Sequence, residues 1–222
     1  ARRLQANGVL DGGVDDEGNW SGKIIYKPER LDMPRHWKKP QVVAVNWLGD
    51  MFHENVPPEV WPAVYRVMAE TPQHRYLVLT KRYDEMWSRS AVVFRPLSNV
   101  YLGATISCMK DRVDAWFPLY DLSEHGWNTW VSFEPALEEA SWAGYEWLNG
   151  IVCGGESGIK ARSMPIQAAY RARDFCRLNK IPFTMKAGSQ GAPALLDGEM
   201  IFQFPKEAKA KESNGKKRVC RW

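Results

Sequence analysis

Six short runs of apolar residues recur along this chain, and each run ends in polar residues. The six segments are QVVAVNW (41–47), HRYLVLT (74–80), NVYLGATIS (99–107), NTWVSFEP (128–135), GIVCGGESG (150–158) and IPFTMKAG (181–188). Within each run the apolar residues are continuous rather than alternating. Continuous apolar runs are typical of strands that are covered on both faces, as in parallel sheets.

Segments with helical spacing lie between these runs. Apolar residues fall on one face in 60–68, 113–120 and 168–176, whereas 83–92 and 137–147 are weaker helix predictions. Strand and helix thus alternate about six times. This order predicts an α/β fold with a parallel sheet, either a partial (β/α) barrel or a doubly wound sheet.

The beginning of the chain does not follow this alternation. Residues 8–40 are rich in Gly, Pro and charged residues, with GKIIYK (22–27) as a candidate short strand. The opening ARRLQANG (1–8) is typical of the end of a helix that stops at a glycine. A helix without its beginning indicates that a first strand is missing. Removal of the initiator Met before Ala1 is the alternative explanation.

The polar residues after the runs are the candidate site. Right-handed crossovers place the carboxyl ends of parallel strands at one edge, which is where barrels form their active sites. The residues expected at that edge are Asp50, Thr80, Lys81, Arg82, Thr105, Ser107, Glu134, Gly154, Gly155, Glu156, Ser157 and Lys186. Their convergence is the strongest functional signal in the sequence.

Several of these residues can have either a ligand-binding role or a purely structural one. The Gly154–Gly158 stretch lacks the Walker A pattern, so it is either a loop that approaches a ligand or a structural turn. Glu134 precedes Pro135, which favours extended backbone at a strand end. Lys81 and Arg82 either hold a carboxylate or phosphate, or are solvated residues at a helix start.

Metal chemistry within the chain is not predicted. Asp50, His53 and Glu54 lack the spacing of a helical zinc motif. Cys108, Cys153, Cys176 and Cys220 stand far apart and form no CxxC pair. Free thiols are typical of a reducing compartment, which predicts a cytoplasmic protein. We expect no membrane association, because the sequence has no apolar run long enough to span a bilayer.

Charge is concentrated at the end of the chain. The net charge is +4, and residues 206–222 hold seven Lys or Arg against two Glu, or +5, which leaves −1 for the rest. We therefore expect one barrel-like domain at 1–205 and a basic tail at 206–222. The tail is either a solvated end or a non-specific attraction for nucleic acid.

Taken in order, VNWLGDMFHENVP, PQHRYLVLTKR, NVYLGATIS, VSFEPAL, IVCGGESG and IPFTMKAGSQG resemble a bacterial and phage-encoded family of unknown function that is radical-SAM-like. The resemblance covers roughly residues 1–205. It implies a partial (β/α) barrel of the radical-SAM/TIM type that binds S-adenosylmethionine and a [4Fe–4S] cluster. In the family, three cluster cysteines end just before an arginine-rich helix that ARRLQ resembles. The resemblance therefore implies cluster ligands upstream of Ala1.

The resemblance also suggests roles for the candidate residues. Glu134 and Glu156 are expected to bind the cofactor's ammonium or ribose hydroxyls, with Thr105, Ser107 and Ser157 as partners of the ribose. Lys81, Arg82 or Lys186 would hold a carboxylate or a phosphorylated substrate. Gly154–Gly158 then faces the cofactor or substrate.

Three functions remain open at this stage. The first is a radical-SAM-like enzyme that acts on a nucleic acid or nucleotide, with or without a partner protein. The second is a non-radical α/β enzyme that recognises a phosphorylated small molecule at the same face. The third is a binding protein that has kept the barrel and lost the cluster.

Overall fold

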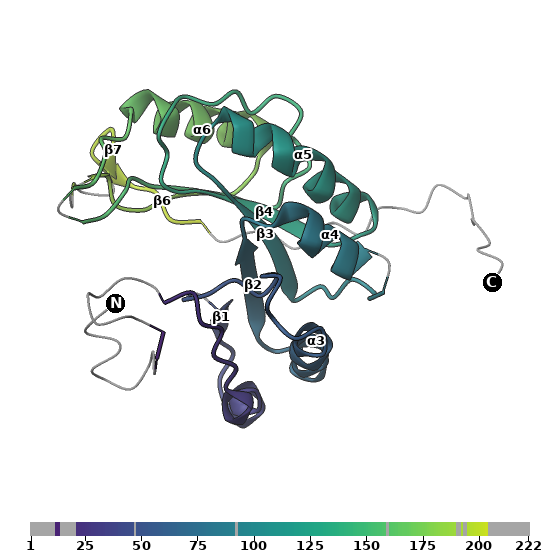
Figure 1. The fold of residues 1–222 in the computed structure, drawn as a ribbon. Coiled ribbons are helices and arrows are strands. Elements are labelled where there is room, and N and C mark those ends of the chain that lie inside the picture. The colour runs from purple at the N-terminus through teal and green to yellow at the C-terminus, as the bar shows by residue number, and fades with distance from the viewer. Residues whose placement is uncertain are drawn as a thin grey trace, which may run out of the picture.

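The six apolar runs form one parallel sheet. The computed structural model describes residues 12–13, 21–46, 48–91, 93–158, 160–189, 192 and 195–203. The strands pair in chain order: β1 (Val42–Val45), β2 (Arg75–Thr80), β3 (Val100–Ile106), β4 (Asn128–Phe133), β5 (Ile151–Cys153) and β6 (Phe183–Met185). The sheet curls into a half-barrel (Figure 1). A doubly wound sheet would reverse its strand order, so that alternative is wrong.

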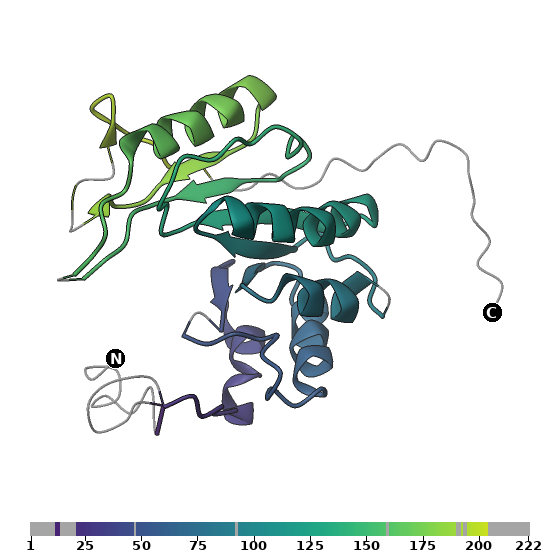
Figure 2. The same cartoon turned by 45° about the horizontal axis from the view of Figure 1, so that its top comes forward.

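Four main helices follow one another along the sheet (Figure 2). They are α3 (Val60–Glu70), α4 (Tyr83–Ala91), α5 (Met109–Glu124) and α6 (Ile166–Asn179). Smaller elements are η1 (Pro28–Arg30), α2 (Met33–His36) and the hairpin of β7 (Leu195–Leu196) and β8 (Glu199–Met200). Among the helices described, none is long and apolar enough to cross a membrane.

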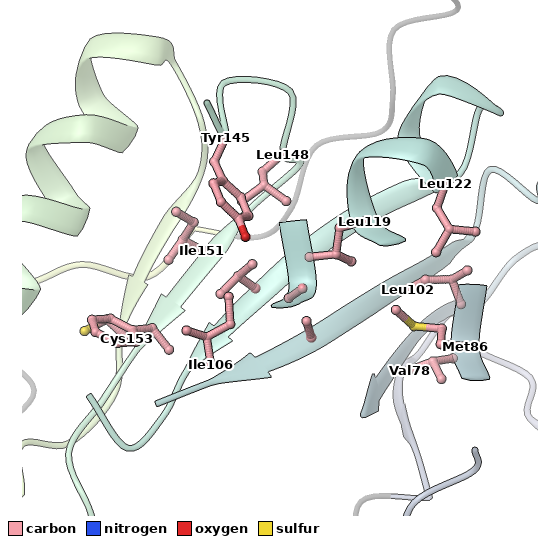
Figure 3. Close-up of a cluster of buried hydrophobic side chains, with 14 of the residues drawn as sticks. Val78, Met86, Leu102, Ile106, Leu119, Leu122, Tyr145, Leu148, Ile151 and Cys153 are labelled. Carbon is pink, nitrogen blue, oxygen red and sulfur yellow. The ribbon is translucent and has the colours of Figure 1, made fainter. Parts of the chain in front are cut away.

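The main core lies between the sheet and these helices. Leu102 and Ile106 of β3 are fully buried and face Leu119 and Leu122 of α5 (Figure 3). Every residue of β4 is buried. Burial of both faces explains the continuous apolar runs of β3 and β4, because neither face of these two strands meets water. The edge strand β1 has an equally continuous run although Val42 is exposed.

The opposite face of the sheet is closed at its centre by a tryptophan. Trp130 of β4 packs over Gly103 of β3, where a Cβ atom would lie 2.3 Å from the indole Nε1. The indole N–H donates to the carbonyl of Tyr101 at 3.3 Å. Gly103 therefore allows a large ring to lie flat on the neighbouring strand.

A buried asparagine joins the amino ends of β2 and β3. The Nδ2 atom of Asn99 donates to the carbonyls of Met68 at 3.0 Å and His74 at 3.1 Å, with a longer contact to Thr71. His74, expected in a loop, is itself completely buried. Its ring accepts the N–H of Gln41 and contacts the Pro34 carbonyl. His74 thus serves the fold.

Two predictions about local structure are wrong. Residues 137–147 form turns, not a helix, because Gly144 has a positive φ of 87° and its carbonyl accepts the indole N–H groups of Trp116 and Trp147. The GKIIYK segment forms no strand in its described part, and Ile24 and Tyr26 there are exposed. The predicted helix end at 1–8 and the tail at 206–222 lie outside the described residues.

The helix expected around 113–120 is confirmed, but its apolar stripe points outward. Val113 is 63% exposed and Phe117 is 52% exposed, whereas Ala115 and Leu119 pack on the sheet. The helices around 60–68, 83–92 and 168–176 are also confirmed. In α3 and α6 most of the apolar residues noted in the sequence are buried.

Candidate functional site

The carboxyl ends of the strands surround a cavity of about 870 Å³. Its lining combines polar strand-end residues with a few apolar side chains, and its surface is about half apolar. The lining residues are Val45, Asn46, Gly49, Asp50, Leu79, Thr80, Lys81, Arg82, Thr105, Ser132, Glu134, Pro135, Gly155, Glu156, Ser157 and Lys186. Ten of the twelve candidate residues from the sequence are therefore brought together here. A volume of this size accommodates a cofactor-sized ligand.

Asp50 organises the wall between β1 and β2. Both of its carboxylate oxygens accept the hydroxyl of Thr80, at 2.7 and 2.8 Å. Its Oδ2 atom also accepts Nη1 of Arg82 at 3.0 Å and contacts the backbone N–H of Lys81. The Asp50 carboxylate therefore ties the loop after β1 to the end of β2. It has little remaining capacity to ligate a metal or accept further donors.

Glu134 is the central acid on the other side of the cavity. Its carboxylate lies 3.0 Å from Nζ of Lys186 and accepts the Ser132 hydroxyl at 2.9 Å. The Glu134 side chain is 18% exposed, and that of Lys186 is 50% exposed. The peptide bond between Glu134 and Pro135 is cis. An ion pair with one half-exposed partner can rearrange to admit a ligand at modest cost.

Gly154 and Gly155 have different roles. A Cβ at Gly154 would lie 2.6 Å from Oε1 of Glu134, so this glycine makes room for the acid. A Cβ at Gly155 would lie 2.3 Å from the backbone N of Ser189. Gly155 also donates its N–H to the carbonyl of Ala187. The two glycines therefore allow the β5 loop to pack against Glu134 and the β6 loop. This favours a structural turn over a loop that approaches a ligand.

Glu156 is already bound by an arginine that the sequence analysis did not single out. Its carboxylate accepts the backbone N–H of Arg162 at 2.7 Å and two guanidinium N–H groups at 2.8 and 2.9 Å. These hydrogen bonds from Arg162 lower the pKa of Glu156 to about 2. Glu156 is thus poorly placed to bind an ammonium, because Arg162 has already neutralised its charge.

The hydroxyl residues divide between the cavity and its surroundings. Thr105 and Ser157 line the cavity, as does Ser132, which belongs to a predicted strand end but was not among the chosen residues. Ser107 is absent from the lining, and its backbone N–H donates to Asp111. Asn46 at the end of β1 is a further lining residue, with a positive φ of 51°. A polar residue directly after an apolar run was the signal that marked Ser132 and Asn46.

The described cysteines do not fit an iron–sulfur cluster. Cys153 and Cys176 are buried, and burial raises the pKa of the Cys176 thiol to about 12. Burial also raises the pKa of Cys153, with a smaller contribution from the nearby Glu134 carboxylate. Cluster ligation requires thiolates. In the described part of the chain, no three His, Cys, Asp or Glu residues are grouped so that they could hold a metal.

S-Adenosylmethionine is a better match to the donor set. Glu134 offers a carboxylate for an ammonium, and Lys186 offers an ammonium for a carboxylate. Thr105, Ser132 and Ser157 supply hydroxyls of the kind that pair with a ribose diol. Val45, Leu79 and Pro135 form an apolar part of the lining for a purine or methylene groups.

Comparison with known proteins identifies one family. Over residues 1–218 the chain matches the family described as "Protein of unknown function (DUF5131)", and it belongs to that family. No curated protein and no solved structure matches the chain. The family description assigns no activity, so the relationship to radical-SAM enzymes stays a prediction.

Proposed function

We propose that this member of the family binds S-adenosylmethionine in the cavity at the carboxyl ends of its strands and is an enzyme that uses this cofactor. The observation that carries the proposal is the pairing of Glu134 with Lys186 in the lining of this cavity. A carboxylate and an ammonium 3.0 Å apart complement the ammonium and carboxylate of an α-amino acid. The hydroxyl groups of Thr105, Ser132 and Ser157 are then available to the ribose of the nucleoside part.

The protein's part in this function is binding and orientation. Ser132 fixes one oxygen of Glu134 by a 2.9 Å hydrogen bond. Gly154 leaves the space that Glu134 occupies, and a side chain there would push the acid aside. The backbone around Gly155 holds the adjacent loop against Ser189. These contacts preorganise one acidic group for a cationic ligand, which reduces the ordering cost of binding.

Radical chemistry is supported only by the sequence resemblance to radical-SAM enzymes. The bound cofactor would supply an adenosyl or methyl group. The described residues provide no cysteine set for a cluster, so we derive no radical step from them. The proposed reaction is the modification of a nucleic acid or a nucleotide.

Isothermal titration calorimetry with S-adenosylmethionine tests the proposal directly. We expect one binding site per chain, together with a rise in melting temperature, because a ligand that binds only the folded state stabilises it. Adenosine and methionine, titrated separately, should each bind more weakly than the intact cofactor. The proposal is wrong if S-adenosylmethionine produces neither binding heat nor a thermal shift at millimolar concentration.

A further inference from the structure

The charges of the lining residues balance, with three cations against three carboxylates, but those at the end of β2 do not: Lys81 and Arg82 face the single carboxylate of Asp50. Each lining carboxylate has its own cation: Asp50 pairs with Arg82 at 3.0 Å, Glu134 with Lys186 at 3.0 Å, and Glu156 with Arg162 at 2.8 Å. Lys81 also lines the cavity and is exposed. Within the part of the chain that the structure describes, its ammonium takes part in none of these pairs. The site therefore has an excess positive charge at the end of β2.

This excess charge does not suit the proposed cofactor. S-Adenosylmethionine carries a sulfonium and an ammonium against a single carboxylate, so it is itself a net cation. A surplus lysine attracts anions and repels cations. Lys81 therefore complements a second, anionic molecule better than it complements the cofactor.

Lys81 is also well separated from the proposed amino-acid subsite. It follows β2, whereas Lys186 follows β6, with β3, β4 and β5 between them. Four strand spacings amount to roughly 19 Å along the sheet. A cavity of about 870 Å³ that extends between these ends can hold two molecules beside each other.

The surroundings of Lys81 favour a phosphate. Arg82 lies next in the chain, and only its Nη1 atom is engaged by Asp50, at 3.0 Å. Its side chain is 36% exposed, so part of it remains accessible to a ligand. A lysine point charge beside a guanidinium fork is a combination suited to phosphate oxygens.

We infer that the substrate of this site carries a phosphate group and that Lys81 binds it at the end of β2. The inference rests on the proposed function, because it assigns Lys81 to the second molecule that a cofactor-dependent reaction needs. The phosphate can belong to a free nucleotide or to the backbone of a nucleic acid strand. A second hollow of about 700 Å³ runs along the edge strand β1, from Lys38 and Lys39 at its amino end to 42–44, and offers a path by which a longer strand could continue from the cavity.

The test uses calorimetry on the full chain with uridine monophosphate, uridine and a short single-stranded oligothymidylate. We expect uridine monophosphate to bind at least about tenfold more tightly than uridine, as for a charge-assisted hydrogen bond. Lys81→Ala should lose this preference, and Lys81→Arg should retain most of it. Lys110→Ala is the matched control, since Lys110 is an exposed lysine on α5 and is absent from the lining.

Separate titrations with S-adenosylmethionine distinguish the two proposals. Unchanged cofactor binding by Lys81→Ala, with loss of uridine monophosphate binding, supports both. Phosphate binding that depends on Lys81, without any cofactor binding, refutes the proposed function and leaves the phosphate site. Equal binding of uridine and its monophosphate overturns the inference. It is also overturned if Lys81→Ala weakens the cofactor as much as the nucleotide, since Lys81 would then hold the cofactor's carboxylate.

The oligonucleotide identifies the source of the phosphate. Tighter binding of oligothymidylate than of uridine monophosphate, weakened by Lys38→Ala and Lys39→Ala, assigns the site to a nucleic acid strand. Equal affinities that are insensitive to those two substitutions assign it to a free nucleotide. Both results support a phosphate-bearing substrate.

Discussion

Glu134 and Lys186 are 52 positions apart in the chain, yet Nζ of Lys186 lies 3.0 Å from Oε1 of Glu134. The two residues follow β4 and β6, and β5 lies between these strands in the sheet. Their side chains meet over Gly154, directly after β5, where a Cβ atom would lie 2.6 Å from Oε1 of Glu134 and 3.2 Å from Cβ of Lys186. The relationship makes Glu134 the acid on which the proposed cofactor site depends.

Glu134→Gln should weaken S-adenosylmethionine binding by at least about tenfold, because a neutral amide loses the charge-assisted contact with the ligand's ammonium. The free energy of unfolding should change by no more than about 1 kcal/mol, since Lys186 is half exposed and can turn to water. Calorimetry and urea denaturation measure the two effects. Glu139→Gln is the control, because Glu139 forms an ion pair with Arg171 and is absent from the lining. Equal affinities of the two variants would contradict this role for Glu134.

Gly103→Ala should destabilise the fold by about 1–3 kcal/mol, the usual range for overpacking. The new methyl group would lie 2.3 Å from Nε1 of the buried Trp130 ring. Urea denaturation measures the loss. In a double-mutant cycle, Gly103→Ala should cost less in a Trp130→Leu background, where the ring is gone. The same cost in both backgrounds would show that Trp130 does not impose the requirement for glycine.

Asn99→Ala should cost about 1–3 kcal/mol, because it removes the donor shared by the carbonyls of Met68 and His74. Asn99→Asp should cost more, since a carboxylate would face carbonyl oxygens without a proton to donate at neutral pH. Thermal or urea unfolding ranks the two variants. Asn55→Asp on the exposed loop should be nearly neutral. If Asn99→Asp were the milder change, the assigned amide orientation would be reversed.

The pH dependence of the Glu156–Arg162 pair follows from its lowered pKa. The ordinary value of 4.5 falls to about 2 through hydrogen bonds from Arg162. The stabilisation is therefore fully present above about 4.5 and is lost as the pH falls toward 2. A carbon-13 NMR titration should place the Glu156 midpoint near 2. In Arg162→Ala the midpoint should rise toward 4.5, whereas Arg171→Ala should leave it in place. A midpoint near 4.5 in the unmodified chain would contradict the pairing.

The sequence alone was sufficient to locate all six strands of the sheet and four of its helices. Each strand is a continuous apolar run, and in β3 and β4 almost every residue is buried. Polar residues at the ends of the runs line the cavity. Ten of twelve chosen residues line this cavity because connections between parallel strands bring all carboxyl ends to one edge. Periodicity also predicted the helix at 113–120, but it did not reveal that Val113 and Phe117 face outward.

Pairing between residues far apart in the chain was decided by the tertiary structure. Local patterns carry no information on which cation meets which carboxylate, since that depends on loop paths and on the curl of the sheet. The contacts of Asp50 with Arg82 and of Glu134 with Lys186 therefore emerged only from the fold. Arg162 is only six positions from Glu156, but no local pattern in the sequence marked this pair either. Because Arg162 neutralises Glu156, that carboxylate is no longer expected to bind an ammonium. Lys81 is the lining cation that takes part in none of these three pairs. The sequence thus determined which residues line the cavity at the strand ends, and the three-dimensional pairing of charges decided which of them are left without an ion-pair partner among those described.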